Sequence, residues 1–265
     1  MADGNGGFIG IQNAPTAGVS VPGIWTMDEV CRAKRAGLWP GGGLDSYTKL
    51  LAHFDGADGA TSATEIVTGS SFTFEGNAQL DTAQSVFGGS SLLLDGSGDA
   101  VYTASSPGHG IGSADFAIEC RVMFNGLPGS GTFMCFMSSG WDVSGQNGHF
   151  FGVSNSSGTR QIVFYWSTNG TATSSVVVNW TPSTGVWYHV VITRSGTTGR
   201  FFVDGTQVGS NQTISATIHT STAAYRIGST GNNNHYLNGW IDECRLSVGT
   251  PRWTANFTPQ PSPYS

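Results

Sequence analysis

Short runs in which apolar and polar residues alternate recur along most of the chain. Residues 186–194 form one such run, rich in Val, Ile, Trp and Tyr, and residues 200–204 form another. A Gly-rich turn at 195–199 separates them, and Asp204-Gly205 follows, a dipeptide suited to the positive φ angles of a tight hairpin turn. The pattern predicts a central antiparallel β-hairpin.

Similar runs continue on both sides of this hairpin and predict an all-β fold. The expected strands are 49–54, 71–75, 90–95, 99–104, 115–124, 132–138, 148–153, 160–167, 174–180, 186–194, 200–204, 224–228 and 238–247. This number of short strands suits two packed sheets of about six strands each. The tail after Thr250 has prolines at 251, 259, 261 and 263 and is expected to be irregular.

Residues 24–37 carry the one convincing helical pattern. Thr26 and Glu29 form a capping box, and Gly37 is placed to end the helix. A helix of about ten residues is not stable alone in water, so its apolar residues must pack on something. The assembly or anchoring residues expected here are Ile24, Trp25, Val30, Leu38 and Trp39.

Two interpretations of this segment stay open. It docks on another protein, or it folds back on its own sandwich. In either case we expect two parts: an N-terminal arm and helix, residues 1–43, and a sandwich with a Pro-rich tail, residues 44–265.

Composition narrows the function classes. Charged residues make up 11% of the chain, against about 25% in average soluble domains, and there are 39 glycines. The net charge is −6 with no basic run, so we expect no nucleic-acid partner. The first twenty residues lack the features of a signal peptide, and no apolar stretch approaches the ~20 residues of a membrane span.

The cysteines show no metal-binding spacing. Cys120 and Cys244 share strand faces with large apolar residues and are expected to be small buried hydrophobes. We expect all four cysteines to be reduced.

The central hairpin also carries a family resemblance. W-x-H-V-x-x-x-R at 187–194 and F-x-V-D-G-x-x-V at 201–208 resemble the hairpins of laminin-G-like domains of the concanavalin A-like class. Further similar segments follow in the expected order at 50–62, 88–102, 115–124 and 236–247. The resemblance implies a jelly-roll β-sandwich and places Trp187 and His189 in its core, with Phe116, Ile118, Cys120, Val122 and Cys244 also facing inward.

Three narrower segments are similar to parts of bacteriophage tail and other virion proteins. They are residues 50–59, residues 251–264 and the helical segment at 25–40. This similarity implies a role in a virion.

An enzyme is not expected. The glycoside hydrolases of the laminarinase type carry an E-x-D-x-x-E arrangement of acids on one strand, and this chain has no such triplet. Asp242-Glu243 is the nearest approach, but neighbours on a regular strand point to opposite faces.

Calcium is the one cofactor that the resemblance suggests. Carboxylates in loops suit Ca²⁺, and the candidate ligands are Asp55, Asp95, Asp99 and Asp242. Because Asp-Gly pairs also form turns, a purely structural role is the alternative.

A glycan site would need an aromatic side chain with polar neighbours. Loops 138–149 and 229–236 offer both, and the candidates are Trp141, Asp142, Gln146, Asn147, Asn233, His235 and Tyr236. The alternative is that both loops are polar turns. Trp166 and Trp180 lie in expected strands and are interpreted as packed.

The function expected from these features is that of a non-enzymatic bacteriophage virion protein. It would be made in the host cytoplasm and exposed on the capsid or a tail appendage, anchored by its N-terminal arm. Other virion proteins, further copies of the chain and host-surface glycans are the expected partners. The alternative is a carbohydrate-binding lectin or adhesion module, and a glycoside hydrolase is the third choice.

Overall fold

A computed structural model describes residues 44–214, 217–232 and 234–264. Residues 47–264 form one compact unit. Within the described ranges the chain forms 15 β-strands and one short 3-10 turn, Pro107–His109. The predicted arm and helix, with the anchoring candidates Ile24, Trp25, Val30, Leu38 and Trp39, lie outside the described residues.

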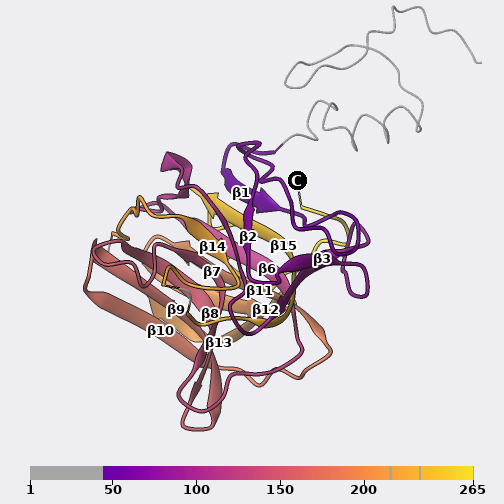
Figure 1. Ribbon diagram of the computed structural model, residues 1–265. Coiled ribbons are helices and arrows are strands. Elements are labelled where there is room, and N and C mark those ends of the chain that lie inside the picture. The colour runs from indigo at the N-terminus through magenta and orange to yellow at the C-terminus, as the bar shows by residue number, and fades with distance from the viewer. Residues whose placement is uncertain (1–43, 215–216, 233, 265) are drawn as a thin grey trace, which may run out of the picture. The chain divides into compact units, whose positions relative to one another are not determined.

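One sheet of the described chain has eight strands, and every pairing between them is antiparallel. In spatial order it contains β13 (Thr206–Thr213), β12 (Thr198–Val203), β11 (Trp187–Ser195), β6 (Phe116–Phe124), β15 (Asn238–Val248), β4 (Ser91–Asp95) and β3 (Gln79–Asp81). The eighth strand, β1 (Thr48–Ala52), pairs with the second half of β15, while β4 pairs with its first half. The long strand β15 is therefore central to this sheet (Figure 1).

The other sheet has seven antiparallel strands within the described residues. Its order is β10 (Thr173–Asn179), β9 (Thr159–Gly170), β8 (Asn147–Ser156), β7 (Phe133–Ser139), β14 (Tyr225–Ile227), β5 (Ala100–Thr103) and β2 (Thr73–Glu75). The prediction of an all-β sandwich is confirmed. The strands β3 and β13 were not predicted, because β3 has only three residues and β13 is largely polar.

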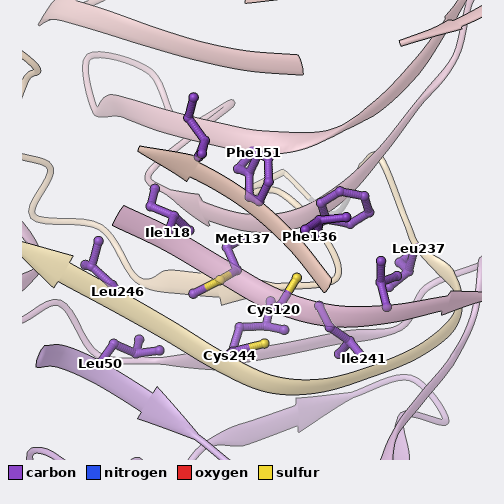
Figure 2. Packing of buried hydrophobic residues seen from close by; sticks show 14 of the residues in the cluster. Leu50, Ile118, Cys120, Phe136, Met137, Phe151, Leu237, Ile241, Cys244 and Leu246 are labelled. Carbon is purple, nitrogen blue, oxygen red and sulfur yellow. The ribbon is translucent and has the colours of Figure 1, made fainter. Parts of the chain in front are cut away.

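Aromatic rings join the two sheets. Phe116 of β6 packs on Phe164 of β9 with ring centroids 5.4 Å apart. Phe136 of β7 packs on Phe124 of β6 at 6.0 Å and on Phe151 of β8 at 5.3 Å. Figure 2 shows that further apolar side chains, Cys120 and Cys244 among them, fill the same core, and both thiols are free and fully buried. The predicted inward positions of Phe116, Ile118, Cys120, Val122 and Cys244 are confirmed.

The predicted core positions of Trp187 and His189 are wrong. On β11 the residues that join the core are Val190 and Ile192. Because side chains alternate between faces, His189 lies on the outer face of the eight-stranded sheet. It is nevertheless buried, because the C-terminal tail covers it: its ring lies 5.9 Å from Trp253 and 6.0 Å from Tyr264. Trp187, nearer the strand end, stays partly exposed.

The tail also closes over a buried charged network. Glu119 Oε1 accepts a hydrogen bond from Arg245 Nε at 2.8 Å, and Glu119 Oε2 lies 2.9 Å from His189 Nε2. Tyr264 covers the Arg245 guanidinium, whose carbon lies 4.3 Å from the ring centroid. Burial alone would raise the pKa of Glu119, but the charge of Arg245 and the hydrogen bond with His189 hold that pKa below its usual value.

Removing the ring of Phe116 tests the packing between the sheets. The side chain is fully buried, so Phe116→Ala should lower the free energy of unfolding by about 3–5 kcal/mol. Urea denaturation followed by tryptophan fluorescence measures this change. A loss below about 1 kcal/mol, typical of surface substitutions, would contradict the assigned core position.

His149 predicts an acid-sensitive stability. Its ring is buried against Phe164 and lies 3.1 Å from the Tyr225 hydroxyl. Burial, with a smaller contribution from His109, lowers its pKa from 6.5 to about 3. Below pH 6.5, His149 is therefore protonated in the unfolded chain but stays neutral in the folded protein. The free energy of unfolding should fall by about 1.4 kcal/mol per pH unit down to about pH 3.

The matched variant is His149→Gln, whose amide can still reach Tyr225 but does not titrate. Urea denaturation at pH 7.5, 5.5 and 4.5 should give a smaller loss of stability for the variant than for the wild type. Parallel pH profiles of the two proteins would show that His149 is not the titrating group.

Candidate functional site

An open aromatic pocket lies on the outer face of the seven-stranded sheet. Its volume is about 110 Å³, and its lining residues are Phe133, Trp141, Phe150, Tyr165 and His235. The strands β7, β8 and β9 supply three of these side chains, and two loops supply Trp141 and His235. Alternation along the strands explains the placement, because Phe151 and Phe164 face the core while their neighbours Phe150 and Tyr165 face outward.

The rings form a corner with several walls. Phe150 and Tyr165 are direct cross-strand partners, with centroids 6.0 Å apart and planes at 78°. Phe133 and Trp141 each contact both of these rings, at 5.9–6.2 Å, so they flank the central pair. Phe150 is 1% exposed and forms the floor, whereas Phe133 and Tyr165 are partly exposed walls.

Gly152 leaves space for the Phe150 ring that forms the floor of the pocket. Gly152 lies two residues beyond Phe150 on β8, on the same face. A Cβ atom there would lie 2.9 Å from the edge of the Phe150 ring and would also collide with the Met134 carbonyl. Any larger residue would displace the ring that closes the bottom of the pocket.

Two loops hold the rim. The turn after β7 passes through Gly140 and Asp142, both with positive φ, and places Trp141 over the sheet. Gly231 donates its N–H to the Trp141 carbonyl at 2.7 Å, which ties the segment at 228–232 to this turn. The His235 carbonyl in turn accepts the Cys135 N–H at 2.8 Å.

A polar pair completes the rim. Asp142 Oδ2 accepts a hydrogen bond from the Thr230 hydroxyl at 2.7 Å and lies 3.4 Å from His235 Nε2. Burial lowers the pKa of His235 from 6.5, although the Asp142 charge opposes this shift. At neutral pH the rim therefore carries a carboxylate beside a largely neutral imidazole.

Of the seven residues predicted to contact glycans, some lie at the pocket and others do not. The structure brings Trp141, Asp142 and His235 together at the pocket. Gln146 and Asn147 instead hold backbone: the Gln146 side chain accepts the Thr222 N–H at 2.8 Å, and the Asn147 side chain accepts the Asp142 N–H at 2.9 Å.

Tyr236 is partly exposed but does not line the pocket, and Asn233 lies outside the described residues. Trp166 and Trp180 are buried in the core, as predicted.

Sequence reasoning missed Phe133, Phe150 and Tyr165. The sequence does contain a signal for two of them: consecutive aromatic residues at 164–166 and at 150–151. Because neighbours on a strand face opposite sides, such a run places at least one ring on the outer face. An aromatic residue at an outward position of a strand must either meet another layer or line an open surface.

The predicted calcium ligands do not form one cluster. Asp99 accepts the N–H groups of Asn77 and Asp95 at 2.8 Å each, and Asp95 accepts the Ser97 N–H at 2.7 Å. This pair has the turn-forming role that was the alternative. Within the described ranges, no group of three or more His, Cys, Asp or Glu side chains has the geometry of a metal site.

Asp242 differs from this pair. A β-bulge between Asp242 and Arg245 lets both Asp242 and Glu243 leave the core, so the expectation that these neighbours point to opposite faces is wrong. Asp242 Oδ2 accepts the Val86 and Phe87 N–H groups, while its buried Oδ1 has no hydrogen-bond partner. Burial raises its pKa to about 7, and the charges of Glu243 and Asp55 add to the effect.

Comparisons with known proteins identify the family. Residues 95–250 match the model of the concanavalin A-like lectin/glucanases superfamily, in its laminin G group. The chain belongs to this superfamily. No curated protein matches the chain.

Solved structures share the fold at low sequence identity. Domain 4 of the extracellular arabinanase AbnA from Geobacillus stearothermophilus, solved with arabinotriose, is 15% identical with a TM-score of 0.55, over 77% of this chain and 95% of that domain. The binding domain of botulinum neurotoxin DC, solved with SialylT, is 16% identical with a TM-score of 0.55, over 76% of this chain and 48% of its own length.

The binding domain of Paraclostridial Mosquitocidal Protein 1 is 11% identical with a TM-score of 0.56, over 76% of this chain and 48% of its own length. The chain therefore spans about half the length of these toxin binding domains. Within the part of the chain that the structure describes, no helix is long and apolar enough to cross a membrane.

Calcium addition tests the role of Asp242. An oxygen that is buried without a donor suits a hard cation, and the Asp55 and Glu243 carboxylates lie near enough to interact with Asp242. If Asp242 holds a calcium ion, then at pH 8, above the Asp242 pKa of about 7, millimolar Ca²⁺ should raise the melting temperature and EDTA should lower it, by mass action on the folded state.

Asp242→Asn keeps an oxygen for the Val86 and Phe87 N–H groups and should abolish the calcium response. Asp95→Asn serves as the matched control and should keep it. A wild-type melting temperature unchanged by both calcium and EDTA would leave Asp242 with a purely structural role.

Proposed function

We propose that this protein is a non-catalytic carbohydrate-binding module and that the aromatic pocket on the seven-stranded sheet receives part of a glycan. The observation that carries the proposal is the pocket itself. Four aromatic side chains converge on an open surface, with a carboxylate and an imidazole at the rim. Ligand sites characteristically combine apolar and aromatic walls with a few placed polar groups.

Membership of a lectin and glucanase superfamily supports this choice. Two of the similar domains were solved with carbohydrate, one with arabinotriose and one with SialylT. At sequence identities of 15% and 16%, these structures show a shared fold but not a shared ligand. The ligand specificity of this chain therefore has to be argued from its own pocket.

The arrangement of acids favours binding over hydrolysis. Glycoside hydrolases place two carboxyl groups about 5–9.5 Å apart across the scissile bond. The residues that line the pocket include no carboxylate, and Asp142 approaches it only through His235. Glu243 is engaged by His53 at 2.8 Å and by the Tyr264 N–H at 2.7 Å, on the other sheet.

Placement on a bacteriophage virion remains a prediction that rests on the segments at 25–40, 50–59 and 251–264. A carbohydrate-binding module is compatible with it, because a virion surface protein that contacts host glycans would need such a site. The predicted homo-oligomer and virion partners likewise remain predictions.

Substitution of the partly exposed walls tests the proposal. Phe133→Leu and Tyr165→Leu keep apolar volume but remove the aromatic faces, so they should weaken binding to glycans found on an array by about tenfold or more, equivalent to about 1.4 kcal/mol. Trp187→Leu, a partly exposed aromatic residue on the other sheet, is the matched control and should bind as the wild type does.

Isothermal titration with the best array ligand provides the affinities, and thermal melting checks that each variant is folded. If the wild type binds no glycan, or if both wall variants bind as well as the control, the pocket is not the carbohydrate site.

A further inference from the structure

We propose that the group held in the aromatic pocket is a trimethylammonium cation, the head group of choline. This inference rests on the proposed function in that it concerns the same pocket, and it adds the chemical class of the substituent that enters. The argument depends on the shape of the pocket, its size and the charge at its rim.

The shape favours a compact, rounded group. The planes of Phe150 and Tyr165 meet at 78°, those of Phe133 and Tyr165 at 76°, and those of Phe133 and Phe150 at 89°. Rings at right angles enclose a corner, whereas a pyranose stacks best on one flat face. A tetrahedral ammonium group presents a methyl group to each wall of such a corner.

The size points the same way. The pocket holds about 110 Å³. An engineered apolar cavity of about 150 Å³ accommodates one benzene molecule. A trimethylammonium group has fewer heavy atoms than benzene and fits, while a complete hexose with its hydroxyl groups does not enter.

Charge supplies the selectivity. The faces of aromatic rings carry negative electrostatic potential and attract cations, and quaternary ammonium groups are the ligands that aromatic cages recognise. The Asp142 carboxylate lies behind His235, 3.4 Å from its Nε2, and adds negative charge at the rim. Because burial lowers the pKa of His235, the imidazole does not cancel this charge at neutral pH.

No arginine occupies the pocket within the described ranges. The arginine–ring contacts there involve Phe87, Phe116, Tyr102 and Tyr264, and none of these rings lines the pocket. The His235 ring packs edge-on against Phe133 at 5.3 Å and Phe150 at 5.8 Å, and Phe133 and Tyr165 are the aromatic walls that remain partly exposed to a ligand.

The test compares choline with its neutral isostere, 3,3-dimethylbutan-1-ol, in which carbon replaces nitrogen. Both are titrated into the intact protein at pH 7.5 and followed by tryptophan fluorescence and by chemical-shift changes. Choline should bind saturably, at least about fivefold more tightly than the alcohol, as expected for a cation–π contribution of about 1 kcal/mol.

Asp142→Asn separates charge from shape. Asparagine tolerates the positive φ of 65° and still offers an oxygen to Thr230. This variant should weaken choline binding by about threefold or more and leave binding of the alcohol unchanged. Tyr165→Leu should weaken both ligands, and Trp187→Leu should weaken neither.

Equal affinity for choline and the alcohol, or no saturable binding of choline, would overturn the inference. The inference and the proposed function fail separately. If neutral glycans bind and choline does not, the inference fails and the carbohydrate-binding function stands. Choline binding without any glycan binding would support the inference alone.

The same head group occurs on choline-substituted polysaccharides and on phosphatidylcholine. Retention on the polysaccharide, competed by free choline, would identify a glycan source. Sedimentation with phosphatidylcholine vesicles, competed in the same way, would identify a lipid source.

Discussion

The contact between the two sheets, made by residues at alternate positions of each strand, is the constraint on which the structure depends. Across this layer Phe116 meets Phe164 at a centroid distance of 5.4 Å, and Phe124 meets Phe136 at 6.0 Å. Because these rings face the core, the residues between them on each strand must face outward. The chemistry of the molecule is therefore decided by how each outer face is completed.

The two outer faces are completed differently. On the eight-stranded sheet, the tail covers the charged network of Glu119, His189 and Arg245, and the burial of these groups depends on that cover. On the seven-stranded sheet, aromatic residues face outward around a pocket, and Trp141 and His235 join them from two loops. We propose a binding role for this second face because it combines apolar side chains with access to solvent.

Periodicity was sufficient for the sandwich and for most of its strands, because alternation is a local property of the sequence. The family resemblance was wrong about His189, because a strand motif does not reveal that the C-terminal tail covers the outer face of the sheet. Periodicity failed for Asp242, where a bulge breaks the alternation. Trp141 and His235 were found as aromatic and polar loop residues, whereas Phe133, Phe150 and Tyr165 depend on the register between strands, which the sequence does not display.

The central position of β15 has a consequence for biosynthesis. This strand, Asn238–Val248, pairs with β6, β4 and β1, which come much earlier in the chain. A ribosome releases those partners long before it releases β15, so until then their edges remain unpaired and available to other chains. The nascent protein thus carries its greatest risk of aggregation late in synthesis, and a chaperone that shields the β4 and β6 edges would be most useful in that interval.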